Sequence, residues 1–356
     1  MNQIVESARL TQKDFASSDD VRWCPGCGDY GILSGVLKLM PELGIPKERI
    51  VWVSGIGCSS RFPYYVDTYG FHSIHGRAPA IALGIKAANP ELSVWIATGD
   101  GDGLSIGGNH LLHCLRRNLD VKILLFNNRI YGLTKGQYSP TSELGKQTHS
   151  SPFGSADRPI DPIRFALGCG ATFVARSYDT AGPQLLDVLR RAAAHRGTAF
   201  VEIMQNCHVF NDATFDAITN KSTAASHQLR LEHGKPMLFG DNRSQGLALD
   251  PAALKLRRIQ NPGTNGSTDS VLVHDESNAA LAHLLASLEF PEFPVPLGVL
   301  SAVSLPTYED QLHRLDTQSI ANGACGLAEL LNSGQVWQVS NPPAKAVAQT
   351  ESSWSV

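Results

Sequence analysis

Oxygen-bearing side chains stand between glycines in the segment Gly99-Asp100-Gly101-Asp102-Gly103, and again further along at Asn127-Asn128. The apolar segments 92–98 and 121–126 precede these motifs and predict buried strands, with a helix over about 105–118 between them. The carboxyl ends of parallel strands meet at one edge of an α/β sheet, where such sheets bind ligands. Carboxylate and amide oxygens suit Mg²⁺, which keeps phosphate oxygens in its shell, and glycines let backbone N–H groups approach a diphosphate. Asp100 and Asn128 therefore predict a magnesium and diphosphate site.

Seven cysteines provide the second possible chemistry. Four of them fall in loops that can open on the same sheet edge: Cys24, Cys27, Cys58 and Cys207. In a reducing compartment close cysteines indicate metal or redox chemistry rather than disulfides. Four thiolates hold either a [4Fe–4S] cluster or a zinc ion, and both remain open. The others are expected to be inert thiols: Cys114, Cys169 and Cys325.

These residues depend on an alternation of strands and helices. Strands are predicted over 51–54, 92–98, 121–126, 172–175 and 199–204, and helices over about 30–43, 78–88, 105–118, 162–167 and 182–196. The alternation predicts an α/β fold with a doubly wound parallel sheet. We expect a polar N-terminal arm over 1–20, a cofactor-binding domain over 21–215, a C-terminal extension over 216–330, and a mobile tail over 331–356.

Composition limits the class of protein. The chain of 356 residues is 42% hydrophobic and 18% charged, with a formal net charge of −3, which gives no reason to expect nucleic acid as a partner. No apolar run approaches the ~20 residues that span a bilayer, and residues 1–20 contain no apolar signal-peptide core. A cytoplasmic protein without a membrane partner is expected.

Motif order brings out a family resemblance. The Gly-Asp-Gly and Asn-Asn motifs, at this spacing, resemble the signature of thiamine diphosphate enzymes. Further motifs precede or extend them in order: Cys24-Pro25-Gly26-Cys27-Gly28, Gly55-Ile56-Gly57-Cys58-Ser59, His75-Gly76-Arg77-Ala78 and Asn128-Arg129-Ile130-Tyr131-Gly132. The chain resembles the beta subunit of the 2-oxoacid:ferredoxin oxidoreductases over about 20–215, and more loosely to about 300. The resemblance implies a sheet of the thiamine diphosphate-binding type.

The same resemblance implies a set of site residues. Mg²⁺ would be bound by the Asp100 and Asn128 side chains and the Ile130 carbonyl, and a [4Fe–4S] cluster by Cys24, Cys27, Cys58 and Cys207. Thiamine diphosphate would contact Ile56, Gly57, Cys58, Ser59, His75, Gly101, Asp102, Gly132 and Leu133. The simpler interpretation of Asp102 is an acid in the first turn of a helix, and that of His75 is a hydrogen-bonded loop histidine.

Substrate choice depends on two basic residues. In 2-oxoglutarate-using members a basic residue at the place of Arg61 faces the distal carboxylate, and arginine can hold a carboxylate through two hydrogen bonds. The segment Leu133-Thr134-Lys135-Gly136-Gln137 also resembles the 2-oxoglutarate type, so Lys135 is a candidate for contact with substrate or coenzyme A. Both side chains are otherwise interpreted as solvated, and His72 as structural.

The resemblance therefore implies oxidative decarboxylation of 2-oxoglutarate to succinyl-coenzyme A and CO₂, or the reverse carboxylation, with ferredoxin as the electron carrier. The alternatives are a broad-specificity or pyruvate-type member, a non-oxidative decarboxylase with a zinc site, and a protein that keeps the cluster without thiamine diphosphate. No glutamate suited to the aminopyrimidine of the cofactor is evident. We therefore expect an alpha subunit that completes the active site in a heterodimer.

Overall fold

The computed structural model describes residues 10–262, 270–323, 326–337 and 339. The chain divides into two units after Gln311, and each is described by itself. The last part of α9 (Tyr308–Ala321) and α10 (Leu327–Leu331) belong to the second unit and carry exposed apolar side chains such as Leu315 and Leu327. The expected tail over 331–356 lies largely outside the described residues.

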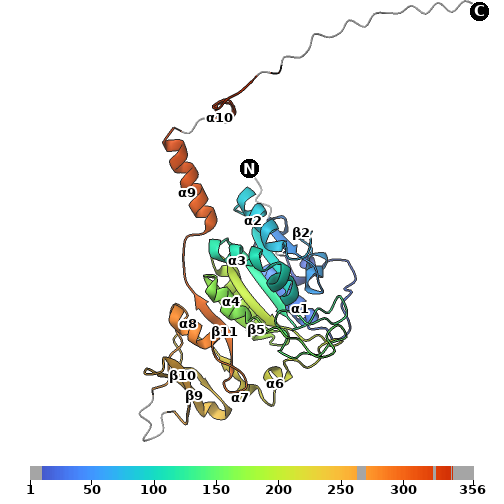
Figure 1. Cartoon of the computed structure of the whole chain (residues 1–356), viewed down its shortest axis with the longest axis vertical. Helices are drawn as coiled ribbons and strands as arrows, with labels where there is room; N and C mark the ends of the chain where they lie inside the picture. Colours follow the sequence, from blue (N-terminus) through green and yellow to red (C-terminus); the bar gives the residue numbers. More distant parts are fainter. Residues whose placement is uncertain (1–9, 263–269, 324–325, 338, 340–356) are drawn as a thin grey trace, which may run out of the picture. The chain divides into compact units, whose positions relative to one another are not determined.

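One eight-stranded sheet forms the centre of the first unit (Figure 1). Its strands, in spatial order, are β2 (Tyr69–His72), β1 (Ile50–Ser54), β3 (Ser93–Gly99), β4 (Val121–Asn127), β6 (Ala199–Met204), β5 (Phe173–Tyr178), β11 (Val295–Ala302) and β7 (Gln228–Arg230). The six strands from β2 to β5 are parallel, whereas β11 is antiparallel to β5. The predicted α/β sheet is confirmed.

Helices cover both faces of this sheet. On one face α1 (Asp29–Leu39) and α5 (Pro183–Ala194) pack on β-strand side chains such as Trp95 and Ala97. On the other face α2 (Ala78–Ala88), α3 (Gly108–Arg117), α4 (Pro162–Gly168) and α8 (Ala279–Ala286) pack on side chains such as Val94 and Ile96. Because successive residues of β3 alternate between the two cores, the sheet is buried on both faces, which is typical of doubly wound folds.

Residues from the expected C-terminal extension take part in this sheet, since β7 and β11 form its far edge. The same region forms a second, antiparallel sheet from β8 (Leu238–Phe239), β9 (Gln245–Asp250) and β10 (Lys255–Gln260), and two short helices, α6 (Asp216–Thr219) and α7 (Ala224–His227). Among the described residues, no helix has the length and apolar character needed to cross a membrane.

Two predicted helices have different bounds in the structure. The helix expected over 30–43 ends as α1 at Leu39 and continues as a 3₁₀ turn, Met40–Leu43, because Pro41 has no N–H to donate to an α-helical bond. The helix expected over 105–118 begins only at Gly108. It is preceded by a π-helical turn, Asp102–Ile106, which changes the direction of the chain directly after the Gly-Asp-Gly motif.

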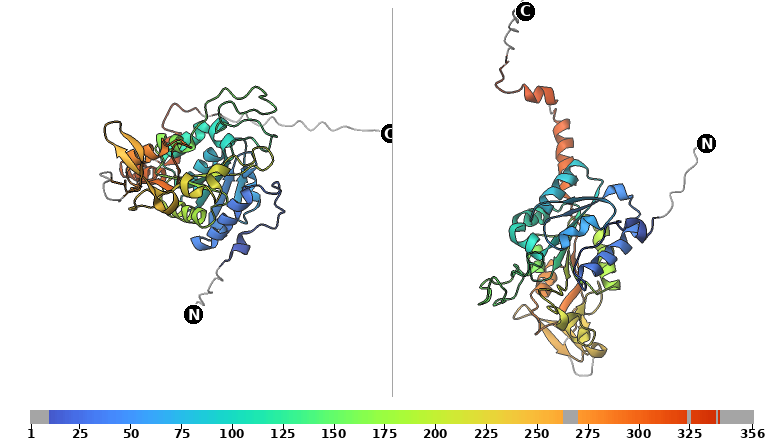
Figure 2. Two further views of the ribbon diagram at one scale, coloured as in Figure 1. Left: turned by 90° about the horizontal axis from the view of Figure 1, so that it is seen from below. Right: turned by 90° about the vertical axis from the view of Figure 1, so that its right-hand side faces the viewer.

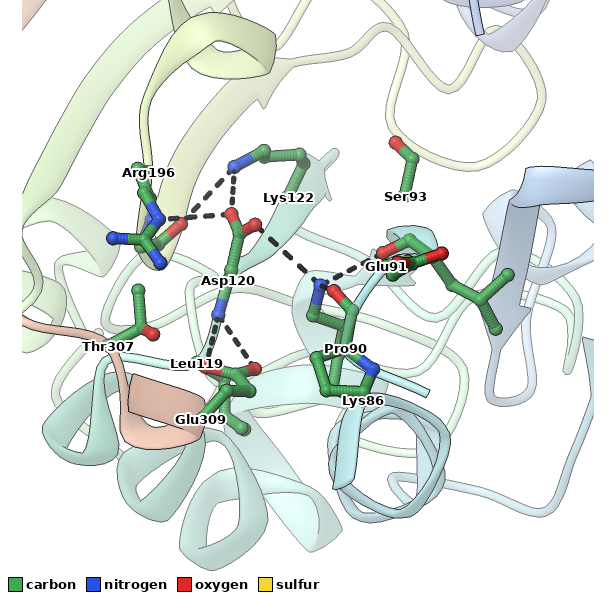
Figure 3. Close-up of polar contacts among 12 residues, drawn as sticks. Lys86, Pro90, Glu91, Ser93, Leu119, Asp120, Lys122, Arg196, Thr307 and Glu309 are labelled. Carbon is green, nitrogen blue, oxygen red and sulfur yellow. Dashed lines mark hydrogen bonds and ion pairs between the residues drawn. The ribbon is translucent and has the colours of Figure 1, made fainter. Parts of the chain in front are cut away.

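Two buried lysines, Lys86 and Lys122, lie near the amino-terminal ends of strands β3 and β4 (Figure 3). Lys122 Nζ donates to Asp120 Oδ1 at 2.7 Å, and Lys86 Nζ lies 3.6 Å from Asp120 Oδ2. Burial acts to raise the pKa of Asp120, but the two lysines hold it below its ordinary value. The Asp120 backbone N–H donates to Glu309 Oε1 at 3.2 Å, which ties the first turn of α9 to this edge.

Candidate active site

The expected magnesium ligands lie at the carboxyl ends of β3 and β4. Asp100 is buried, and its Oδ2 accepts hydrogen bonds from the hydroxyls of Ser139 and Thr141, both at 2.6 Å. Burial raises the pKa of the Asp100 carboxyl, and the two hydroxyls act against that rise. Asn128 Oδ1 accepts from the Ile130 N–H at 3.1 Å, so the asparagine side chain and the Ile130 backbone form one turn.

Asp100, Asn128 and Ile130 line a cavity of about 70 Å³, called here the Asp100 cavity. Its wall includes every residue expected to contact thiamine diphosphate or Mg²⁺: Ile56, Gly57, Cys58, Ser59, His75, Asp100, Gly101, Asp102, Asn128, Ile130, Gly132 and Leu133. The loop 131–161, which supplies Gly132 and Leu133, runs at the margin of the molecule and is drawn in green (Figure 2). Residues from four separate loops are thus brought together, and their roles stay predictions.

The Asp102 carboxylate joins two of those loops to the end of strand β3. Its Oδ1 accepts from the backbone N–H groups of Ile56 and Gly76, at 3.0 and 2.7 Å, and its Oδ2 accepts from the Thr98 hydroxyl at 2.7 Å. His75 Nδ1 lies 2.7 Å from the same Oδ1. Asp102 is buried, so these donors compensate the cost of removing a carboxylate from water. Its hydrogen bonds thus support the loops around the cavity, and its contact with the cofactor stays a prediction.

Close backbone approach at this site requires glycine. A Cβ on Gly101 would lie 2.2 Å from the Tyr131 ring, whose hydroxyl donates to the Gly101 carbonyl at 2.9 Å. A Cβ on Gly55 would lie 2.2 Å from Asp102 Oδ2. Gly101 lines the cavity without a side chain, which fits the approach of a diphosphate to its backbone.

All four expected cluster ligands line a second cavity, of about 210 Å³, called here the cysteine cavity: Cys24, Cys27, Cys58 and Cys207. A Cβ on Gly132 would lie 3.4 Å from Cys207 Sγ and 3.6 Å from Cys58 Sγ. Among the described residues no three His, Cys, Asp or Glu side chains are arranged to hold a single metal ion. Four thiols around one cavity are the donor set of either a [4Fe–4S] cluster or a zinc ion, the two alternatives expected from the sequence.

The surroundings of Cys27 and Cys58 favour the neutral form of both thiols, because burial raises the pKa of each. Burial, with smaller contributions from the neighbouring Asp29, Cys207 and Cys24, raises the pKa of Cys58 to about 12. Asp29 is itself buried, and this burial raises its pKa to about 7. Ligation of positively charged metal would reverse the balance for the thiols, because a coordinated thiol loses its proton.

Five residues belong to the walls of both cavities: Cys58, Asn128, Gly132, Leu133 and Gln205. The two cavities are therefore separated by a single layer of side chains and backbone, called here the shared wall. Cys58 lines both cavities, and its backbone carbonyl accepts a hydrogen bond from Trp23 Nε1–H at 2.7 Å, which fixes its position in the wall. The loop after β1 thus positions groups for both cavities.

The three expected catalytic residues lie in different places. His75 lines the Asp100 cavity, and Arg61 lines both the cysteine cavity and a larger cavity of about 480 Å³ beside it. Lys135 lines the cysteine cavity and is not part of the Asp100 cavity wall. His72, interpreted from the sequence as structural, also lines the larger cavity, 3.1 Å from the Tyr64 hydroxyl. Their catalytic roles stay predictions.

Sequence reasoning missed the groups that support the ligand loops. Asn127 Nδ2 donates to Glu202 Oε1 at 2.7 Å, and Glu202 Oε2 accepts from Arg176 Nε at 2.6 Å. Glu202 and Arg176 are both buried, on adjacent strands β6 and β5. Glu202 and Arg176 could have been recognised from the sequence, because charged residues in otherwise apolar buried strands need partners. Ser139 and Thr141 carried no signal beyond their place in a polar loop.

Comparison with known proteins agrees with this geometry. The family model "Thiamine pyrophosphate enzyme, C-terminal TPP binding domain" matches residues 52–203. The chain is 50% identical to 2-oxoglutarate oxidoreductase subunit KorB of Mycobacterium tuberculosis over 92% of this chain and 88% of that protein. It is 44% identical to the beta subunit of 2-oxoacid:ferredoxin oxidoreductase 2 of Aeropyrum pernix, over 58% of this chain and 66% of that one.

A solved structure gives the same result. The 2-oxoglutarate:ferredoxin oxidoreductase from Magnetococcus marinus, with 2-oxoglutarate, coenzyme A and succinyl-coenzyme A bound, superimposes with a TM-score of 0.74 at 32% identity. The match covers 93% of this chain and 98% of that one. With half of its residues shared with one curated relative over nearly its whole length, the chain belongs to the family of 2-oxoacid:ferredoxin oxidoreductase beta subunits.

Proposed function

We propose that this chain is the beta subunit of a 2-oxoglutarate:ferredoxin oxidoreductase. The reaction is the decarboxylation of 2-oxoglutarate to succinyl-coenzyme A and CO₂, or its reverse, with electrons exchanged with ferredoxin through a [4Fe–4S] cluster. The observation that carries this proposal is the shared wall: a cavity lined by the residues expected to bind magnesium and diphosphate adjoins a cavity lined by four cysteines. A decarboxylase that transfers no electrons has no need of the second cavity.

The residues of the Asp100 cavity bind and orient the first cofactor. Asp100 and Asn128 would hold Mg²⁺ through side-chain oxygens and Ile130 through its carbonyl, a hard-oxygen set suited to this ion. Backbone groups of Gly101, Gly132 and Leu133 would face the diphosphate. Thiamine diphosphate, when bound, supplies the nucleophile and the electron sink for loss of CO₂.

The cysteine cavity supports the redox half of the proposal. Cys24, Cys27, Cys58 and Cys207 would hold the cluster, and Cys24, which is exposed, marks the side open to solvent. Three of the four thiols are only partly accessible, which shields the cluster from water while one edge stays open to an electron carrier. We therefore propose ferredoxin as the external partner at this edge.

Arg61 supports 2-oxoglutarate as the substrate. Its Nε is buried and has no hydrogen-bond partner among the described residues, although an unpaired buried donor costs about 1–3 kcal/mol. A substrate carboxylate in the adjoining cavity of about 480 Å³ would satisfy it. Exchange of Arg61 for Met should therefore raise the KM for 2-oxoglutarate much more than the KM for pyruvate, whereas Arg158→Met, on an exposed loop, should change neither. Equal effects on both substrates would contradict this role.

An alpha subunit is part of the proposal. Among the described residues that line the Asp100 cavity there is no glutamate for the aminopyrimidine ring of the cofactor. We infer that a partner supplies it in a cytoplasmic complex that also binds coenzyme A. The purified chain alone should then show no decarboxylation of 2-oxoglutarate, and the complex should show it.

The test is made on the complex purified without oxygen. We expect about four iron and four sulfide per beta subunit, absorption near ~400 nm, and reduction of ferredoxin that needs both 2-oxoglutarate and coenzyme A. Cys24→Ser should lose most of the iron, while Cys169→Ser, outside both cavities, should keep it. Zinc in place of iron would support the non-oxidative alternative, and faster reaction with pyruvate would assign the pyruvate type.

A further inference from the structure

Gln205 is a buried polar residue whose position the proposed chemistry has not used. It follows strand β6, is 1% exposed, and belongs to the shared wall between the two cavities. Its backbone N–H donates to the Asn127 carbonyl at 2.8 Å, which aligns it with the residue before the magnesium ligand Asn128. A buried primary amide costs stability unless its donors and acceptor are paired, so the partners of this side chain are informative.

The orientation of the Gln205 amide is determined by its neighbours. Nε2 lies 2.6 Å from the Asn206 carbonyl oxygen and 3.3 Å from Cys27 Sγ. A carbonyl oxygen only accepts hydrogen bonds, so the nitrogen end of the amide must face it. The second hydrogen of Nε2 is then directed at the sulfur of Cys27. The Oε1 atom is buried and has no partner among the described residues.

We propose that Gln205 is a positioning residue that donates an N–H···S hydrogen bond to iron-bound Cys27 and raises the reduction potential of the cluster. This inference rests on the proposed function, because it requires a [4Fe–4S] cluster in the cysteine cavity. Reduction adds one electron to the cluster as the substrate is oxidised, and the transfer itself makes or breaks no bond. A hydrogen bond to a ligand sulfur stabilises the added negative charge, and so favours the reduced form.

Because Cys27 is more buried than Cys24, a hydrogen bond to its sulfur has a larger effect on the reduction potential. Cys24 is exposed, so water can solvate its sulfur, whereas Cys27 is half-buried and packs against the core beneath α1. Electrostatic interactions are stronger where water is excluded. Gln205 belongs to the shared wall, so its N–H acts on Cys27 from the side of the Asp100 cavity, from which the electrons come.

The test compares two glutamine variants in the assembled complex by redox titration followed by electron paramagnetic resonance. Gln205→Met keeps the length of the side chain and removes the donor. Gln228→Met is the matched control, because Gln228 is also buried and donates to a backbone carbonyl (Ile218, 2.8 Å), and among the described residues its Oε1 has no partner and its amide donates to no cysteine. We expect a more negative midpoint for Q205M, with a several-fold lower ratio of reduced to oxidised cluster at fixed potential. A tenfold change would be 59 mV for one electron.

A second measurement applies even if Q205M assembles no cluster. In wild-type complex made with glutamine labelled with ¹⁵N at Nε2, pulsed electron paramagnetic resonance should detect a ¹⁵N coupling to the reduced cluster. An unchanged midpoint in a fully loaded Q205M, or a missing coupling in the wild type, would overturn the inference while the proposed function stands. Wild-type complex that contains no iron would instead contradict the proposed function itself.

Discussion

Replacement of Asp102 by asparagine tests whether this carboxylate supports the loops of the Asp100 cavity or acts on the ligand. The amide oxygen can still accept from Ile56 and Gly76, and the amide nitrogen can donate to the Thr98 hydroxyl. The hydrogen bonds thus persist, but their acceptor is a neutral amide in place of a carboxylate. The substitution isolates the contribution of charge while keeping the shape of the side chain.

The size of the effect follows from the donors. A hydrogen bond to a charged group contributes about 1.5–3 kcal/mol, and one between neutral groups about 0.5–1.5 kcal/mol. The bonds from Ile56 and Gly76 together should lose about 2 kcal/mol. Because about 1.4 kcal/mol corresponds to a factor of ten, the amides of these loops should exchange with solvent about 30-fold faster. Asp187→Asn, on the exposed side of α5, is the control and should have no such effect.

The assay is hydrogen exchange followed by mass spectrometry on the complex without thiamine diphosphate. Peptides covering 55–60 and 74–78 should exchange faster in the variant, while peptides of β4 should not. Unchanged exchange in both loops, together with weaker binding of Mg²⁺ or thiamine diphosphate, would refute the supporting role. It would mean that Asp102 acts on the ligand directly.

Three further outcomes are expected. Glu202→Gln leaves the buried Arg176 charge with Asp161 alone, 3.7 Å away, so the free energy of unfolding in urea should fall by about 3 kcal/mol, the lower end of the cost of breaking a buried pair, and Mg²⁺ affinity should fall because Asn127 loses its charged acceptor. Burial lowers the pKa of His195 to about 4, so the unfolded chain binds a proton between pH 6.5 and 4 that the folded chain does not, and stability falls as pH falls through that window. His195→Gln should remove this part of the pH dependence, about 1–2 kcal/mol once solvent screening of the half-exposed ring is included. Asp120→Asn removes the counter-charge of two buried lysines and should cost about 3–5 kcal/mol in urea denaturation at pH 7.

The sequence predicted the parts of the fold whose patterns are local. The strands around Asp100 and Asn128 were predicted because apolar runs end at glycine or asparagine, and α2 has the predicted bounds, Ala78–Ala88. Strand β11 was missed because it contains Pro296 and Gly298, which disfavour strands, and because it enters the sheet antiparallel from far along the chain. Strand β2 was missed because all four of its residues are exposed at the sheet edge.

Within the site, motif residues were predictable and supporting residues were not. Asp100, Asn128, Cys24, Cys27 and Cys58 stand in short motifs whose residue types indicate their chemistry, whereas Cys207 was included by its place after a predicted strand and by the family resemblance. The partners of Asp102, by contrast, lie in loops brought close only by folding, such as Ile56 and Gly76. Gln205 stands in no motif, and its contact with Cys27 joins residues far apart in the chain. Such contacts are properties of the packed structure and leave no spacing in the sequence.

The shared wall also limits how enzymes of this design can change. Cys58 is a proposed iron ligand, and the residues just before it line the cavity proposed for thiamine diphosphate and the one next to Arg61. An amino-acid change in this loop that admits a different 2-oxoacid will also displace an iron ligand. Laboratory evolution of substrate range should therefore accumulate paired substitutions, one beside Arg61 and one beside the cysteines. A variant library that varies the two regions separately should yield far fewer active enzymes than one that varies them together.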